Sequence, residues 1–135
     1  KRKMILTSYL LDTHALIFWF SKENVSQEYI DFLDEQNELE NLYVSSISFW
    51  ETALLVKKKR IELKDVNAWR ISLIENSNIK LIRPSAREMI ESTNLPDYHK
   101  DPFDRLLIVQ ALTNNCLFVT KDKIIQQYNL KTFWI

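Results

Sequence analysis

The sequence SYLLDTHALIFWF, residues 8–20, contains the end of a predicted strand and the start of a predicted helix. Tyr9–Leu11 is a short apolar run that fits a buried strand, and Thr13–Phe20 has the length and apolar content of a helix. Asp12 stands between them. A carboxylate in such an apolar setting either lowers stability or has a partner that compensates for its burial.

The alternation of strand and helix continues along the chain. Short apolar runs rich in β-forming residues alternate with longer segments of helical period, which is typical of βαβ units with a parallel sheet. We expect strands near Tyr9–Leu11, Leu42–Val44, Lys80–Ile82, Leu117–Thr120 and Thr132–Trp134. We expect helices at about Thr13–Phe20, Ser26–Leu39, Ser46–Arg60, Asp65–Glu75, Ser85–Ser92, Pro102–Asn114 and Lys123–Tyr128. Right-handed crossovers then place helices on both faces of the sheet.

The composition predicts one globular domain over residues 1–135. Apolar residues make up 46% and charged residues 27% of the chain, which argues against disorder. The 18 basic residues balance the 18 acidic residues. Net charge therefore provides no general attraction to nucleic acids, and any contact with phosphates needs a local basic patch.

The cysteine content and the N-terminal residues bear on the cellular compartment. Cys116 is the single cysteine and cannot form an intrachain disulfide, which fits a reducing compartment, so we expect a cytoplasmic protein. Lys1 to Lys3 and the apolar residues after them imitate a secretory signal, but Asp12 and His14 interrupt it and no cleavage site follows. We expect no membrane-spanning segment.

Four acidic residues occupy positions next to predicted strands. Asp12 follows the first strand, and Glu51 lies in the first turn of the helix after the second strand. Asp104 begins the helix before the fourth strand, and Asp122 lies two residues beyond that strand. Ligands of such sheets bind in the crevice beyond the carboxyl ends of the strands. We therefore expect the four carboxylates to face one crevice.

Each acid also has a purely structural interpretation. Asp12 and Asp122 can each cap a helix that follows. Ser48–Glu51 has the S-x-x-E pattern of a capping box, in which the glutamate bonds the backbone of the cap residue. Asp101 can cap the helix that follows it, with Asp104 as an acid in the first turn. None of these roles explains why four acids fall at one edge of the sheet.

Carboxylates gathered in this way indicate a cation. Without one, their mutual repulsion raises the pKa values of some of them. Carboxylate oxygens select hard cations such as Mg²⁺ or Mn²⁺, which bind through a few carboxylates, waters and substrate phosphates. The pattern therefore favours a phosphoryl-transfer site.

Four segments of the sequence carry a family resemblance. In chain order they are YLLDTHALIFWF, VSSISFWETALLVKKKR, HKDPFDRLLIVQAL and LFVTKDKIIQQYNL. Together they resemble the successive signature segments of PIN-domain proteins, specifically the VapC-type toxins of bacterial toxin–antitoxin pairs. The third segment is the most specific, and the resemblance covers essentially the whole chain. It implies a three-layer α/β/α sandwich with a central, mostly parallel five-stranded sheet.

The resemblance also implies a function, that of an endoribonuclease toxin. The family's acidic quartet, which uses Mg²⁺ or Mn²⁺ to hydrolyse RNA, falls on Asp12, Glu51, Asp104 and Asp122. A homodimer is implied, together with a cognate antitoxin whose C-terminal segment occupies a groove near the active site. Relatives often carry a glycine after the third helix, where this chain has Lys57–Ile61.

Hydrolysis by a metal-activated water is the mechanism that the acidic quartet favours. We expect Asp12 and Asp104 to be the main metal ligands and the products to end in 5′-phosphate and 3′-hydroxyl groups. Thr13 and Thr120 flank the acids. They can orient a water or a ligand carboxylate, or act only as local caps.

Several basic residues near the acids are candidates for contact with RNA phosphates. They are Lys57, Lys58, Arg60 and Arg105. The run that starts at Lys57 can equally be a solvated helix end, where cations are favoured. Arg105 can instead be an ion-pair partner that holds its helix.

Three other functions remain open at the level of sequence. His14 and His99 can act as general base and acid in metal-free cleavage through the RNA 2′-hydroxyl. The chain can be a catalytically inactive PIN-like module that binds RNA or protein. A phosphatase with an aspartyl nucleophile usually needs an acid two residues after Asp12, where this chain has His14.

Overall fold

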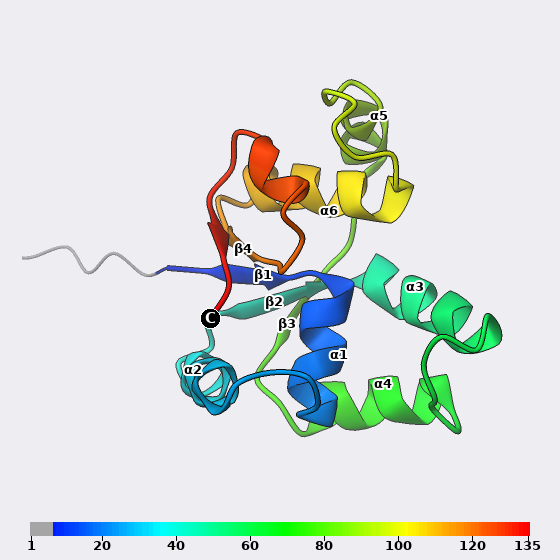
Figure 1. Cartoon of the computed structure of the whole chain (residues 1–135), viewed down its shortest axis with the longest axis vertical. Helices are drawn as coiled ribbons and strands as arrows, with labels where there is room; N and C mark the ends of the chain where they lie inside the picture. The colour runs from blue at the N-terminus through cyan, green and yellow to red at the C-terminus, as the bar shows by residue number, and fades with distance from the viewer. Residues whose placement is uncertain (1–6) are drawn as a thin grey trace, which may run out of the picture.

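Five parallel strands form one sheet at the centre of the molecule (Figure 1). In the computed structural model, which describes residues 7–135, they are β1 Tyr9–Leu11, β2 Leu42–Ser45, β3 Lys80–Ile82, β4 Leu117–Val119 and β5 Thr132–Phe133. Their order is β3-β2-β1-β4-β5, and each neighbouring pair is parallel. The Lys1 to Lys3 segment that imitates a secretory signal lies outside the described residues.

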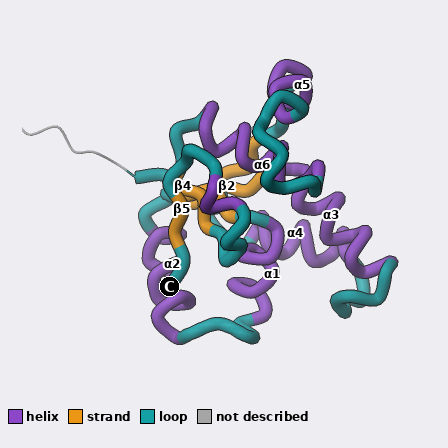
Figure 2. Tube along the Cα trace, turned by 45° about the horizontal axis from the view of Figure 1, so that its top comes forward, coloured by secondary structure: helices purple, strands orange, loops and turns teal. Residues whose placement is uncertain are grey.

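Six α-helices connect the strands within residues 7–135. They are α1 Thr13–Ser21, α2 Gln27–Glu38, α3 Ser46–Lys57, α4 Val66–Glu75, α5 Ala86–Ser92 and α6 Pro102–Thr113. Helices α1, α2 and α4 lie on one face of the sheet and α6 lies on the other, so that helices enclose the strands (Figures 1 and 2). This arrangement confirms the predicted three-layer α/β/α sandwich. No helix in the described part of the chain has the length and hydropathy to cross a membrane.

Each face of the sheet carries its own apolar core, as expected for parallel strands that are buried on both sides. Adjacent Leu10 and Leu11 in β1 are fully buried and belong to opposite cores, because successive side chains of a strand point to opposite faces. One core includes Trp19, Tyr29 and Trp69 from α1, α2 and α4. The other is formed mainly with α6. Packing on both faces holds the strands, and with them the loops at their carboxyl ends, in place.

Polar side chains determine where the helices begin. The caps are Asp12 for α1, Ser26 for α2, Ser45 for α3, Asp65 for α4, Ser85 for α5 and Asp101 for α6. Each accepts a hydrogen bond from a backbone N–H in the first turn, which would otherwise have no partner. A capping box is present in α5, between Ser85 and Glu88.

The predicted helix Lys123–Tyr128 is wrong. Only a single 3₁₀ turn, η1 Ile125–Gln127, forms there. Tyr128 has an extended backbone, with ψ at 157°, and its hydroxyl donates to the carbonyl of Pro96 at 2.7 Å. A continuing helix is incompatible with this backbone conformation, in which Tyr128 reaches the loop before α6.

Helix α3 ends three residues before the predicted Arg60, in a left-handed turn at Lys59. Lys59 has a φ of 59°. Its N–H donates to the carbonyl of Val56 at 3.0 Å, and the N–H of Arg60 donates to the carbonyl of Leu55 at 2.9 Å. This is the Schellman pattern, in which glycine is the usual left-handed residue. The turn that relatives often make with glycine thus forms here with lysine.

Replacing Lys59 by Gly should raise the free energy of unfolding by about 1 kcal/mol, because glycine has no Cβ to oppose the left-handed conformation. Urea denaturation measures the change. Lys58 is the matched control, since its φ is −82°, and K58G should lower stability. Equal losses in both variants would show that the left-handed turn carries no steric cost.

Candidate metal centre

The structure brings the acidic quartet to one pocket beyond the carboxyl ends of β1 and β4. Asp12, Glu51, Asp104 and Asp122 all line it. The pocket is also lined by His14, Phe18, His99, Asp101 and Lys121. Parallel strands end at a common edge, so the fold collects side chains that are far apart in sequence.

Asp12 is an N-cap and a pocket residue at the same time. Its Oδ1 accepts a hydrogen bond from the N–H of Ala15 at 2.7 Å, so the predicted cap is confirmed. Burial raises the pKa of Asp12, and the hydroxyl of Thr120 and the N–H of Ala15 partly oppose that increase. The cap uses one carboxylate oxygen and leaves the other for a second partner.

Glu51 does not belong to a capping box, contrary to one of its predicted interpretations. Helix α3 begins at Ser46 with Ser45 as its cap, so Ser48 lies inside the helix and Glu51 lies in the second turn instead of the first. Glu51 is buried, and its Oε1 has no hydrogen-bond partner among the described residues. Burial raises the pKa of Glu51. A buried carboxylate oxygen without a hydrogen-bond partner is costly unless a proton or a cation joins it.

Asp104 lies in the first turn of α6, where Asp101 is the N-cap as predicted. Asp101 Oδ1 accepts hydrogen bonds from the N–H groups of Phe103 at 2.8 Å and Asp104 at 3.4 Å. Burial raises the pKa of Asp104 to about 8, with further contributions from the neighbouring carboxylates Asp101 and Glu51. At neutral pH the Asp104 side chain therefore holds a proton when no cation is bound.

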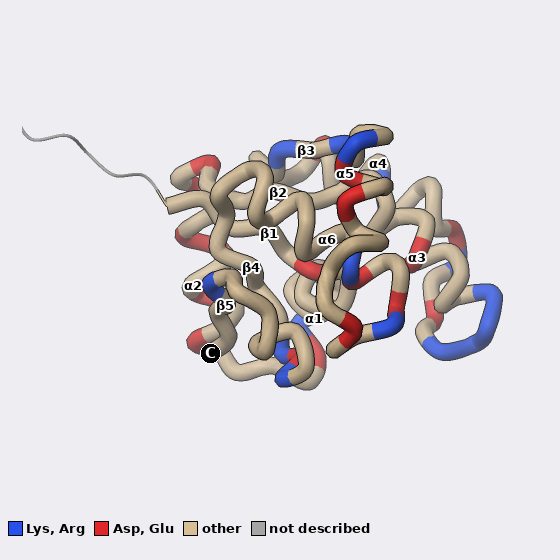
Figure 3. Tube along the Cα trace, turned by 90° about the horizontal axis from the view of Figure 1, so that it is seen from above, with Lys and Arg blue, Asp and Glu red and all other residues tan. Residues whose placement is uncertain are grey.

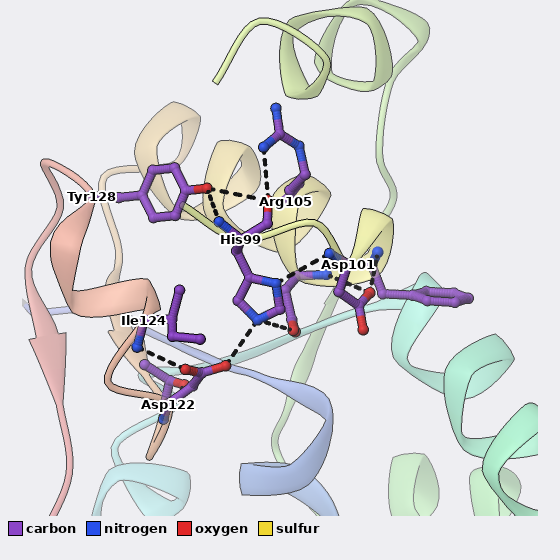
Figure 4. A network of polar contacts seen from close by, with 9 residues as sticks. His99, Asp101, Arg105, Asp122, Ile124 and Tyr128 are labelled. Carbon is purple, nitrogen blue, oxygen red and sulfur yellow. Dashed lines mark hydrogen bonds and ion pairs between the residues drawn. The ribbon is translucent and has the colours of Figure 1, made fainter. Parts of the chain in front are cut away.

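Asp122 follows β4 by three residues and is held by its own loop and by a histidine (Figure 4). Its Oδ1 accepts from the N–H of Ile124 at 2.8 Å, so it supports a turn and not the predicted helix. His99 Nε2 lies 2.9 Å from Asp122 Oδ2 and 3.0 Å from Asp104 Oδ2. Each of His99, Asp104 and Asp122 offers one atom that could bind a metal, and these three atoms all lie within 4.8 Å of one another.

The bridging contact of His99 was not predicted from the sequence, which suggested only an acid–base role. A signal was present, because His99 precedes Asp104 by five residues in HKDPFD. Its contact with Asp122, 23 residues away, depends on how β4 and α6 pack. The structure therefore adds an imidazole to the predicted set of carboxylates.

A comparison with protein families decides the classification. The PIN domain matches residues 9–130, which is most of the chain. The chain belongs to the PIN-domain family. The comparison with curated proteins gave no match.

Solved structures share the fold of this PIN domain. A chain in the VapBC2 complex from Rickettsia felis, bound to a promoter DNA fragment, has 19% identity and a TM-score of 0.72 over 96% of this chain and 100% of that one. A chain in a toxin–antitoxin complex from Klebsiella pneumoniae has 22% identity and a TM-score of 0.58, over 85% of this chain and 87% of that one. FitAcB from Neisseria gonorrhoeae has 18% identity and a TM-score of 0.62, over 93% of this chain and 96% of that one. At these identities the likeness establishes the fold.

The two threonines of this PIN domain are buried behind the acids. Thr13 donates a hydrogen bond to Ser48 Oγ at 3.0 Å, which ties the start of α1 to α3. Thr120 Oγ1 accepts from the N–H of Asp122 at 3.1 Å, and its hydroxyl also lowers the pKa of Asp12. Thr120 thus connects two members of the acidic quartet.

The basic run of this PIN domain, residues 57–60, covers the last residue of α3 and the loop after it, at the end of α3 that is furthest from β2 (Figure 3). Lys59 and Arg60 line a groove between α1, α3 and α4, and Lys58 and Arg60 line a second, smaller groove. Glu51 lines both grooves as well as the acidic pocket. Lys57 lines neither groove. Of the predicted basic run, Lys58, Lys59 and Arg60 therefore line the grooves beside Glu51.

Arg105 has a structural role in place of the predicted phosphate contact. It is 8% exposed, and its guanidinium donates to the carbonyls of Ser92, Leu95, Pro96 and His99 at 2.9 to 3.1 Å. These bonds occupy the fork-shaped guanidinium, which binds phosphate through the same donors. Arg105 therefore holds the loop between α5 and α6, and with it the backbone of His99.

The metal-free protein should lose stability as the pH rises from about 5 to about 8.5. Between the ordinary pKa of 3.8 and the raised value of about 8, folded Asp104 keeps a proton that the unfolded chain releases. The free energy of unfolding therefore falls with increasing pH in this range. The raised pKa values of Asp12 and Glu51 act in the same direction.

Scanning calorimetry in EDTA checks this dependence on pH. Saturating Mn²⁺ should reduce the fall in Tm, because a cation that binds only the folded state replaces the proton. D104N should reduce the fall in EDTA. A metal-free Tm that rises over the same pH range would contradict the assignment.

Proposed function

We propose that this PIN domain is a Mg²⁺- or Mn²⁺-dependent endoribonuclease that acts as the toxin of a toxin–antitoxin pair. The observation that carries the proposal is the buried Oε1 of Glu51. This atom has no hydrogen-bond partner within residues 7–135, and Glu51 lines a pocket with three further carboxylates. Three of the four acids have raised pKa values. Such a set is stabilised by a divalent cation.

The residues present fit a hard cation. Asp12 and Asp122 each use one oxygen for a backbone N–H, which orients the carboxylate toward the pocket. Asp104 and Glu51 complete the set from α6 and α3. When bound, Mg²⁺ or Mn²⁺ supplies positive charge that acidifies water and stabilises the negative charge of a phosphodiester under attack. The chain's own task is to hold four carboxylates at one edge of a rigid sheet.

The basic loop supports a nucleic acid as the substrate. Lys58, Lys59 and Arg60 line grooves that share Glu51 with the acidic pocket, so phosphates on either side of a scissile bond can meet positive charge there. Because the net charge of the chain is zero, this local run has to provide the attraction. We assign RNA over DNA from the resemblance to VapC-type toxins.

A protein partner follows from the same resemblance. One structural neighbour is a toxin–antitoxin complex, and the groove between α1, α3 and α4 combines apolar residues such as Phe18, Phe20 and Trp69 with Lys59 and Arg60. A peptide with apolar anchors and acidic residues fits such a surface. We propose that a cognate antitoxin occupies this groove and that the toxin is a homodimer.

Cleavage of total cellular RNA tests the proposal. With Mn²⁺ the purified chain should produce fragments with 5′-phosphate and 3′-hydroxyl ends, and EDTA should abolish cleavage. Fragments that form in EDTA and end in 2′,3′-cyclic phosphates would contradict the metal mechanism and favour His14 and His99. No cleavage in Mn²⁺ would favour an inactive binding module.

A further inference from the structure

His99 has one ring nitrogen whose role the backbone decides. Its Nδ1 lies 3.1 Å from the backbone nitrogen of Asp101, which carries a hydrogen and donates it. A backbone N–H needs a lone pair on its acceptor, so Nδ1 is the unprotonated nitrogen. The hydrogen of the neutral imidazole is then on Nε2. His99 is therefore a donor through Nε2.

The Nε2 donor is directed at Asp122 (Figure 4) and lies beside a second member of the acidic quartet, Asp104. It hydrogen-bonds Asp122 Oδ2 at 2.9 Å and lies 3.0 Å from Asp104 Oδ2. Asp122 comes from the loop after β4, and Asp104 comes from the first turn of α6. One imidazole thus spans two carboxylates that belong to separate parts of the chain.

The backbone of His99 is held on both sides, which fixes the place of its ring (Figure 4). Its N–H donates to the hydroxyl of Tyr128 at 2.8 Å, and its carbonyl accepts from Arg105 Nη1 at 2.9 Å. The His99 side chain is only 15% exposed. Few alternative positions are open to a largely covered ring on a backbone fixed in this way.

We infer that His99 is a positioning residue of the proposed metal site and is not itself a metal ligand. It fixes Asp122 by donating Nε2–H and lies against Asp104. A ligand nitrogen needs a free lone pair, and His99 uses its available lone pair on Asp101. Because Nε2 lies next to Oδ2 of Asp104, the Oδ1 atom of Asp104 is left for a cation. The inference rests on the proposed function, because it gives His99 a role at that site.

Two substitutions separate positioning from ligation and from a merely structural role. H99Q places an amide N–H near the position of Nε2, whereas H99N places polar atoms near the position of Nδ1 and cannot reach the carboxylates. A positioning role predicts that H99N weakens Mn²⁺ binding by about 10- to 100-fold, the usual effect of removing a partner behind a metal ligand. H99Q should stay within about threefold of the wild type.

Calorimetric Mn²⁺ titrations of the wild type, H99Q and H99N give the readout, with circular dichroism to confirm folding. Equal losses of affinity in both variants would overturn the inference in favour of ligation. Wild-type affinity in both variants would overturn it in favour of a structural role. Failure of the wild type to bind Mn²⁺ would instead contradict the proposed function.

Nitrogen NMR of the metal-free wild type tests the inference without a variant or a metal. In protein labelled at the histidine nitrogens, with His14 as the second signal set, His99 should show a protonated Nε2 and an unprotonated Nδ1. The opposite tautomer would overturn the inference, whatever the outcome of the titrations.

Discussion

Asp12→Asn should abolish Mn²⁺-dependent RNA cleavage and leave the metal-free protein at least as stable as the wild type. Asparagine retains the Oδ1 atom that accepts the N–H of Ala15, and it is as good an N-cap as aspartate. The charge is lost, and burial already disfavours that charge, as the raised pKa of Asp12 shows. Loss of Asp12 as a proposed direct ligand should reduce cleavage by more than the about 100-fold that residues behind the ligands contribute.

Asp65→Asn is the matched control for this variant. Asp65 caps α4 by accepting the N–H of Ala68 at 3.0 Å, and it is exposed and does not line the acidic pocket. D65N and D12N make the same Asp→Asn change at the N-cap of a helix. Because Asp65 lies outside the pocket, D65N should keep both the activity and the Tm of the wild type. A D12N protein that cleaves RNA like D65N would remove Asp12 from the site, and a D12N protein that unfolds would make its role structural.

Arg105→Lys should lower the Tm by roughly 10 °C, because lysine cannot serve the carbonyls that the guanidinium now joins. These are the carbonyls of Ser92, Leu95, Pro96 and His99. A fully buried acceptor left without a donor costs about 1 to 3 kcal/mol, and four partly buried acceptors together should reach this range. Mn²⁺ affinity should fall as well, since the backbone of His99 loses one of its anchors.

Arg87→Lys is the matched control, and calorimetry measures the Tm of both variants. Arg87 pairs with Glu91 at 2.9 Å, but its side chain is 87% exposed, and exposed pairs contribute little. R87K should keep the Tm of the wild type. If R105K behaves in the same way, the loop between α5 and α6 is held by other contacts.

Local patterns were sufficient for the fold and for the acidic quartet. The run from Tyr9 to Phe20 places a strand, an acid and a helix in immediate succession, and the structure contains them in that order. Since parallel strands end at a common edge, the positions of Asp12 and Asp122 next to strands were enough to bring them to one pocket. These inferences depend on the spacing of apolar residues along strands and helices, which can be read from short segments of sequence.

Features that depend on competition between neighbours were not predictable in the same way. Ser48–Glu51 has the pattern of a capping box, but Ser45 begins α3 earlier, and this moves Glu51 to the second turn. The left-handed Lys59 occupies a position where glycine would be expected. Without that glycine, the basic run from Lys57 was the only signal for the end of α3, and it did not fix the last residue. The roles of His99 and Arg105 depend on tertiary contacts with the loop before α6.

Calorimetric titration of Mn²⁺ into the wild type, D12N and D65N tests most directly whether the acidic quartet is one cation site. The wild type and D65N should bind Mn²⁺ with the same saturable isotherm, and D12N should lose most of the affinity. Absence of binding to the wild type, or an isotherm for D12N equal to that of D65N, would contradict the account.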